Sequence, residues 1–159
     1  EHLNDRSDEI CELYNNVGNV YLTINDFDEA VKYYESALSM KSSLLGNNHI
    51  DTTGTICNLG QAHVGLGNLD KALELYNQAL SIREKHGKNR KDVGQVCNEI
   101  GNIYIKLKRY GDAQIFLQRS LRGKRQSASN NDPSHIENEL ITLSNLGHLF
   151  FKKEQYSKA

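Results

Sequence analysis

The sequence lacks the features that mark membrane and secreted chains. Its 159 residues include one proline, one methionine and no tryptophan. Because proline interrupts helices, so low a content favours long helices. No run of about 18 apolar residues is present, so a transmembrane helix is not expected. The N-terminal residues EHLNDRSDEI also lack the charged-then-apolar pattern of a secretory signal.

Cysteine is scarce and widely spaced. Cys11, Cys57 and Cys97 are an odd number and form no CxxC pair, so neither a disulfide framework nor a metal site is expected. Their helical positions favour buried, inert thiols, with Cys57 the one that could be accessible. A reducing interior, the cytoplasm by default, is the simplest location.

Motifs of catalysis are missing as well. The chain has no HExxH, no P-loop and no GxSxG motif, and its six histidines do not cluster. Gly65-x-Gly67 follows no strand and reads as a turn between two helices. We therefore expect no enzymatic activity, no catalytic residue, no metal and no cofactor.

What the chain does have is a globular composition with an uneven charge. Apolar residues make up 38% and charged residues 25%, and the net charge is −1. Residues 1–36 carry −7, whereas residues 83–125 carry +8. Such a chain could contact charged partners or its own neighbours head to tail, or the charges could lie on solvated helix faces. Nucleic acid is an unlikely partner, because the overall charge is near neutral and no aromatic residues interleave with the basic segment.

An internal repeat is the main signal. Four glycines recur at spacings of 42, 41 and 46 residues: Gly18, Gly60, Gly101 and Gly147. Twelve residues after each glycine stands an alanine: Ala30, Ala72, Ala113 and Ala159. Sixteen residues after the glycine, the first three copies have Tyr34, Tyr76 and Leu117. A small residue in each of two helices lets their backbones approach, and the large residue fills the space beside them.

Each copy divides into two amphipathic helical halves, separated by a short polar break. These breaks are Asn25-Asp26, Gly65–Asn68, Lys108-Arg109 and Lys153-Glu154. Asparagine and glycine suit such turns because they tolerate a left-handed backbone. The pattern predicts an all-α fold of helical hairpins, with three complete repeats and the first helix of a fourth.

On these residues the chain resembles the tetratricopeptide repeat family. The second copy carries Leu59-Gly60, His63, Ala72, Tyr76 and Ala79; the first carries Val17-Gly18, Tyr21 and Ala30; the third carries Ile100-Gly101, Tyr104 and Ala113. The period is longer than the usual 34 residues. Residues 45–53 look like the linker of the long-repeat branch typified by kinesin light chains, with Ile50 where that branch commonly has proline. We expect one solenoid domain over residues 1–159, with repeats at 8–45, 51–87, 91–126 and 136–159.

The resemblance implies a binding role for the first helix of each pair. In this family, residues three and two before the glycine, and one and five after it, tend to face a concave groove. Carboxamides dominate these positions here. The candidate peptide-binding residues are Asn15, Asn19, Asn58, Gln61, Asn98, Asn102, Lys106, Asn145, His148 and Lys152.

A carboxamide both donates and accepts, so a row of them could satisfy the backbone of an extended peptide. The asparagines could instead solvate the face or bond between neighbouring helices. Lys106, His148 and Lys152 favour an acidic ligand.

We therefore expect a protein–protein interaction module within a larger scaffold or adaptor protein. The alternative is a structural spacer or self-associating solenoid segment without a peptide ligand. The fourth copy stops at Ala159, barely into its second helix. A repeat cannot bury its face alone, so we expect exposed apolar surface at the C-terminal end and self-association there.

Overall fold

The described part of the chain is entirely helical in its regular structure. The computed structural model describes residues 2–86, 90–126 and 133–157. These residues form seven helices: α1 (His2–Thr23), α2 (Phe27–Leu45), α3 (Thr52–Gly65), α4 (Leu69–His86), α5 (Arg90–Lys106), α6 (Tyr110–Gln126) and α7 (Pro133–Ser157). The expected all-α fold of three helical pairs and one further helix is confirmed.

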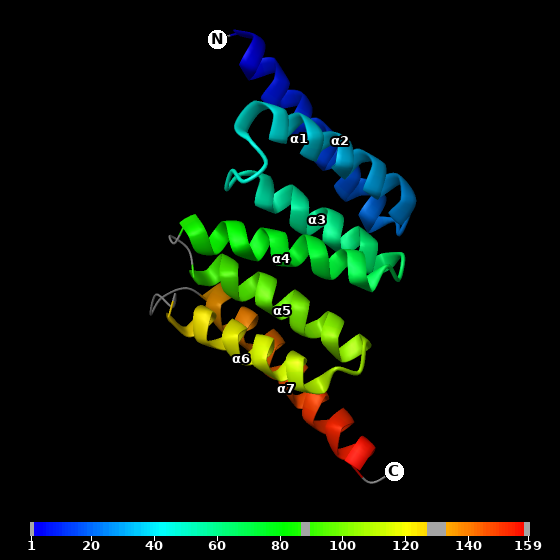
Figure 1. The fold of residues 1–159 in the computed structure, drawn as a ribbon, viewed down its shortest axis with the longest axis vertical. Helices are drawn as coiled ribbons and strands as arrows, with labels where there is room; N and C mark the ends of the chain where they lie inside the picture. Colours follow the sequence, from blue (N-terminus) through cyan, green and yellow to red (C-terminus); the bar gives the residue numbers. More distant parts are fainter. Residues whose placement is uncertain (1, 87–89, 127–132, 158–159) are drawn as a thin grey trace. The chain divides into compact units, whose positions relative to one another are not determined.

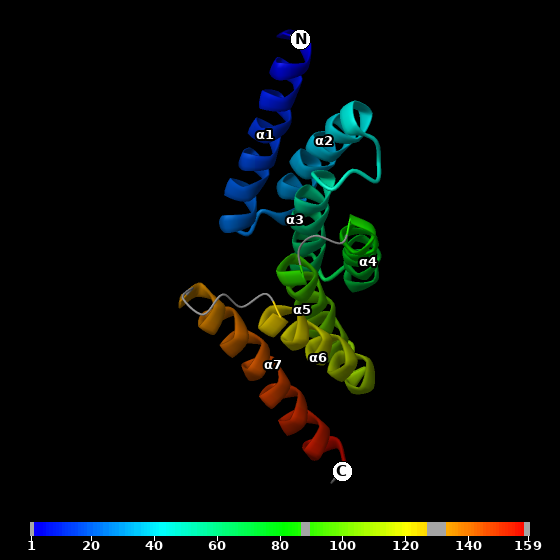
Figure 2. The same cartoon turned by 90° about the vertical axis from the view of Figure 1, so that its left-hand side faces the viewer.

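The helices belong to two compact units, residues 1–86 and residues 87–159. In the first unit, α1–α2 and α3–α4 are successive hairpins (Figure 1), and α3 packs against α2. In the second unit, α5 and α6 form a hairpin and α7 packs against α6. The N-terminal turns of α1 extend past α2, and the C-terminal turns of α7 extend past α6 (Figure 2).

The turn inside each hairpin has the same backbone conformation. The residue seven positions after the repeat glycine has a positive φ in all three: 61° at Asn25, 77° at Gly67 and 58° at Lys108. This left-handed residue ends the first helix in a Schellman motif. Its closing hydrogen bonds are all 2.9 Å long: Asp26 N to Tyr21 O, Asn68 N to His63 O and Arg109 N to Tyr104 O. The repeat in the sequence is therefore a repeat of hydrogen bonds.

Lys108 occupies the left-handed position where the other hairpins have asparagine and glycine. A lysine β carbon is unfavourable there, whereas glycine adopts this conformation freely. We expect Lys108→Gly to raise the free energy of unfolding by about 0.5–1 kcal/mol. The measurement is denaturant unfolding followed by circular dichroism. In the same experiment Gln118→Gly, at an exposed position inside α6, should lower it by about the same amount; a gain for both would contradict the argument.

The repeat glycines lie where two helices approach each other. A β carbon built on Gly18 would lie 2.6 Å from the ring of Tyr34, and one on Gly101 would lie 2.7 Å from Leu117. At Gly60 the nearest atom, on Tyr76, would be 3.1 Å away. The large residue sixteen positions after the glycine thus packs directly on the glycine backbone.

Each unit has its own core. In the first unit, α2, α3 and α4 contribute the buried residues Ala30, Tyr34, Ile56, Leu59, Ala62, Leu75, Ala79 and Ile82. In the second unit, α6 and α7 contribute Ala113, Leu117, Leu146 and Leu149. Burial of this apolar surface is the main stabilising term in both units.

Candidate functional site

Three of the expected groove residues come together in the first unit. Asn58 of α3 donates its side-chain N–H groups to the side-chain oxygens of Asn15 (3.3 Å) and Asn19 (3.2 Å) on α1. The phenol of Tyr34 also donates to Asn19 Oδ1, at 2.8 Å. The asparagines therefore do bond between neighbouring helices. Both lone pairs of Asn19 Oδ1 are used in this way, whereas in the described part of the chain the amide nitrogen of Asn15 has no partner.

A cavity of about 280 Å³ lies beside these carboxamides. Its walls come from α1, α2, α3 and the loop before α3: Glu12, Asn15, Asn16, Lys41, Asp51, Gly54, Thr55 and Asn58. Asn16 is exposed, and no hydrogen bond of its side chain occurs within the described residues. The cavity thus offers carboxamide donors and acceptors, two carboxylates and one ammonium group.

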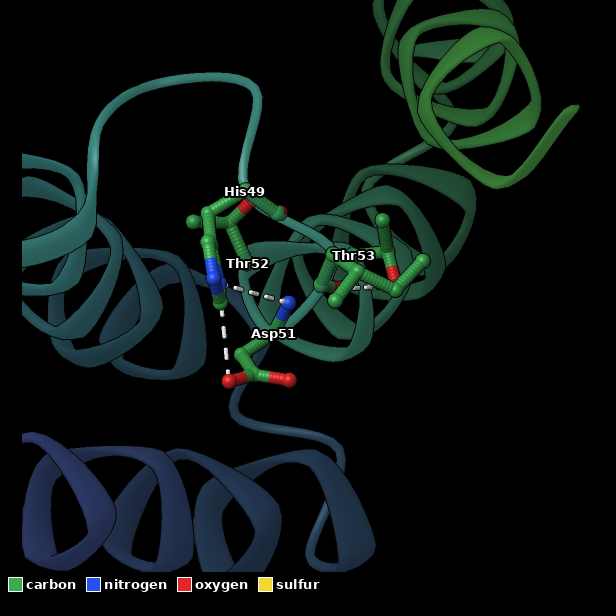
Figure 3. Close-up of polar contacts among 5 residues, drawn as sticks. His49, Asp51, Thr52 and Thr53 are labelled. Carbon is green, nitrogen blue, oxygen red and sulfur yellow. Dashed lines mark hydrogen bonds and ion pairs between the residues drawn. The ribbon is translucent and has the colours of Figure 1, made fainter. Parts of the chain in front are cut away.

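Asp51, in the loop before α3, lines this cavity. Figure 3 shows the polar contacts that hold the loop. The Asp51 backbone N–H donates to His49 Nδ1 at 3.3 Å, and Asp51 Oδ2 lies 3.5 Å from the same nitrogen. The hydroxyl of Thr52 donates to the His49 carbonyl at 2.6 Å, and that of Thr53 to the Ile50 carbonyl at 2.8 Å. These local bonds satisfy loop carbonyls at the start of α3. The linker at residues 45–53, which the sequence analysis compared with the long-repeat branch, thus contributes Asp51 to the wall of the cavity.

Gln61, the fourth candidate in this unit, is exposed on α3 and does not line the cavity. The sequence reasoning missed Lys41 and Asp51, and Glu12 was not among the expected binding residues. Lys41 belongs to a second helix, which the expected groove pattern omits. The charged residues of the cavity could not be found from the glycine register alone.

Asn98, in the second unit, is buried rather than open to a ligand. It is 4% exposed, and its Oδ1 accepts from Asn145 Nδ2 (3.1 Å) and Thr142 Oγ1 (3.3 Å) on α7. Its amide group donates to Glu99 Oε1 at 3.3 Å. The hydroxyl of Thr142 also lies 3.4 Å from that of Ser120 on α6. Asn98 therefore joins α5 to α7 within a largely buried polar network.

The other candidates in the second unit have more open surroundings. Lys106 and His148 are exposed, and Asn102 and Asn145 are half-buried. The side chain of Lys152 lies outside the described residues.

His63 stands at the repeat position where the first and third copies have Tyr21 and Tyr104. It is half-buried, and its Nδ1 is buried without a hydrogen-bond partner among the described residues. Burial lowers the pKa of the imidazole, because desolvation disfavours the charged ring. The neutral ring therefore acts as a packing group.

No disulfide joins Cys11, Cys57 and Cys97, all of which lie within the described residues. Cys11 and Cys97 are buried and Cys57 is half-buried, in line with the expected order of accessibility. Burial raises the pKa of Cys97 to about 12 and, more weakly, that of Cys11. At neutral pH both buried thiols are protonated and poor nucleophiles.

Tyr34 gives the first unit a measurable dependence on pH. Burial raises the pKa of its phenol from 10.0 to about 12. Only the neutral phenol can donate to Asn19, so this stabilisation is fully present below pH 10 and is lost as the pH rises toward 12. We expect the unfolding midpoint in urea to fall over this interval. Tyr34→Phe should be less stable by about 1 kcal/mol at neutral pH but should fall less steeply above pH 10; equal slopes would contradict the assignment.

Within residues 2–86, 90–126 and 133–157, no three His, Cys, Asp or Glu side chains are grouped as metal ligands would be. Nor is any helix in the described part apolar enough over its length to cross a membrane.

The repeats match a known family. Two tetratricopeptide repeat family models match, one at residues 9–85 and the other at residues 94–125. The chain belongs to the tetratricopeptide repeat family. Repeats of this family mediate protein–protein interactions and are typically not catalytic. A comparison with curated proteins finds no match.

Solved structures share the tetratricopeptide fold of this chain. BtubC (BKLC) of P. vanneervenii is 23% identical with a TM-score of 0.81, over 96% of this chain and 60% of that one. The TPR-like repeats of a Podosopora anserina protein described as a kinesin light chain are 16% identical, with a TM-score of 0.71. The match covers 89% of this chain and 68% of that one. The Sgt2 TPR domain of Aspergillus fumigatus is 14% identical, with a TM-score of 0.69 over 94% and 82%. At these identities the likeness is one of fold.

Proposed function

We propose that this chain binds an extended peptide on the carboxamide-lined faces of its first helices, as part of a larger scaffold or adaptor protein. The observation that supports this proposal most directly is the cavity of about 280 Å³ in the first unit, which Asn15 and Asn16 of α1 line together with Asn58 of α3. The absence of a disulfide among the three cysteines, all within the described residues, suits a reducing compartment such as the cytoplasm.

Carboxamides match a peptide backbone because each offers a donor and an acceptor. Asn16 has no internal partner in the described part of the chain, and Asn15 keeps its amide donors. The side-chain amide of Asn58 donates to Asn15 and Asn19, and these bonds hold α1 and α3 in register. The side-chain oxygen of Asn58 can then accept from a ligand N–H. Each such bond contributes only about 1 kcal/mol, so a ligand must make several.

In the second unit, the proposed peptide contacts are Asn102, Lys106, Asn145 and His148. The buried Asn98 positions Asn145 by accepting a hydrogen bond from its side-chain amide. Lys106 and His148 suit a ligand with acidic side chains or a terminal carboxylate. The cavity of the first unit contains the carboxylates of Glu12 and Asp51 beside Lys41, so an acidic ligand suits the second unit better.

The test is a display selection of random linear peptides against the 159-residue chain, repeated with Asn16→Ala/Asn58→Ala. Because each lost bond contributes about 1 kcal/mol, enriched peptides should bind the variant about tenfold more weakly or worse. The matched control is Gln78→Ala, which removes an exposed carboxamide from the second helix α4.

Circular dichroism must show that both variants remain folded. Peptides that bind wild type and Gln78→Ala equally well, and the double variant poorly, support the proposal. If no peptide is enriched, or binding survives in the double variant, this face is not a peptide receptor. A second variant, Asn102→Ala/His148→Ala, tests the face of the second unit in the same way.

A further inference from the structure

A second cavity adjoins the carboxamide-lined cavity of the first unit. Its volume is about 420 Å³, and it shares Glu12, Lys41 and Asp51 with the first cavity. Asp8 and Leu45 complete its lining. Its walls therefore come from α1, α2 and the loop before α3, all within one compact unit. A peptide whose backbone lies on the carboxamides can place a side chain among these charged groups.

Negative charge predominates in the two cavities. The carboxylates of Asp8, Glu12 and Asp51 line them, and the ammonium group of Lys41 offsets only part of this charge. In the described part of the chain, the carboxylates of Asp8 and Glu12 have neither an ion pair nor a hydrogen bond. The first unit contains 13 acidic and 6 basic residues, for a net charge of −7. Both the local and the overall charge thus favour a cationic ligand group.

Thr55 of α3 provides an independent indication of a ligand. It lines the first cavity and is only 4% exposed. Within the described residues its hydroxyl has no hydrogen-bond partner, whereas the hydroxyls of Thr52 and Thr53 on the same helix are bonded to carbonyls. Buried polar side chains rarely lack a partner, because the unmade hydrogen bond costs free energy. A polar ligand group in the cavity would supply that partner.

We propose that the peptide bound on this face carries a lysine or arginine whose cationic group lies among Asp8, Glu12 and Asp51. The cation donates to these carboxylates, and such charge-assisted hydrogen bonds are stronger than those of the carboxamides. The hydroxyl of Thr55 bonds a polar group of the same ligand. The basic ligand rests on the proposed function, since it names the ligand class of the same site.

The test begins with peptides from a random linear display library. Those that bind the wild type and lose binding to Asn16→Ala/Asn58→Ala are kept, and each should contain a lysine or arginine at one position. Each peptide is then synthesised with an acetylated N-terminus, once with the basic residue and once with norleucine in its place. Isothermal titration calorimetry with the wild type should show about tenfold weaker binding of the norleucine peptide, because the bonds to a charged group are lost.

Glu12→Gln/Asp51→Asn removes two charges and keeps the size of both side chains. The basic peptide should bind this variant about tenfold more weakly than the wild type, and the norleucine peptide should bind both within about twofold. The matched control is Glu9→Gln/Asp28→Asn, which removes two charges from exposed positions outside both cavities. This control should bind both peptides as the wild type does. Circular dichroism must show that each variant remains folded.

Thr55→Val separates a ligand contact from a structural role. Valine has nearly the same shape as threonine but no hydroxyl, so the basic peptide should bind this variant at least about threefold more weakly. The urea midpoint of unfolding should stay the same or rise, because an unpaired buried hydroxyl is removed. A lower midpoint with unchanged affinity would mean that the hydroxyl serves the fold, and the independent support from Thr55 would be overturned.

The basic ligand can fail while the proposed function stands. That is the result if the selected peptides need Asn16 and Asn58 but contain no basic residue. It is also the result if norleucine weakens binding to the wild type and to Glu12→Gln/Asp51→Asn equally. If no peptide is enriched, or if none needs Asn16 and Asn58, both proposals are overturned.

Discussion

Replacing Gly18 with valine should destabilise the first unit by about 3 kcal/mol. The added β carbon would lie 2.6 Å from a ring atom of Tyr34, closer than such atoms can approach. The ring cannot easily move away, because Tyr34 is fully buried and its phenol is hydrogen-bonded to Asn19. Overpacking of this kind costs about 1–3 kcal/mol, and a branched side chain lies at the upper end. Denaturant unfolding of the pure protein measures the loss.

Two other glycines provide matched controls. A β carbon on Gly54 or on Gly147 meets no atom within 4 Å, although both residues lie in helices. Gly54→Val and Gly147→Val should therefore change the free energy of unfolding by less than about 0.5 kcal/mol, since valine is a slightly better helix former than glycine. If Gly18→Val were equally harmless, close backbone approach would not be the reason for glycine in the repeat.

The repeat was predictable because its cause is local and steric. Gly18, Gly60 and Gly101 recur with a large residue sixteen positions later, and in the structure that residue packs on the glycine. The turn residues Asn25 and Gly67 are likewise ones that tolerate a left-handed backbone. Lys108 adopts the same conformation without that preference, because the hydrogen bond from Arg109 to Tyr104 closes the turn there too.

The candidate site was predictable only as a set of positions. Asn15 and Asn98 have the same place in the repeat, three residues before the glycine. Asn15 is half-buried, whereas Asn98 is 4% exposed. The difference comes from Thr142 and Asn145, which α7 brings to Asn98 across more than 40 residues of sequence. The residue pattern along α5 alone cannot predict that Asn98 is buried, because the residues that bury it come from α7.

Removing the Asn98 side chain should lower the free energy of unfolding of the second unit by about 2 kcal/mol. Asn98→Leu keeps the branched shape of the side chain but leaves the side chains of Thr142 and Asn145 without the acceptor they share. An unsatisfied polar group in a buried site costs about 1–3 kcal/mol. Thermal unfolding followed by circular dichroism measures the change. Asn102→Ala, one turn further along α5 at a half-buried position, should cost less than about 0.5 kcal/mol.

A second substitution separates the hydrogen bond from the shape of the site. When both partners of a buried hydrogen bond become apolar, the net cost is small, because no polar group is left unpaired. Asn98→Leu/Thr142→Val should therefore be more stable than the sum of the two single changes predicts, with a coupling of about 1 kcal/mol. Strict additivity would mean that Asn98 and Thr142 do not share a bond in solution. Strong coupling would show that Asn98 joins α5 to α7, which explains why an asparagine at a groove position can serve the fold rather than the ligand.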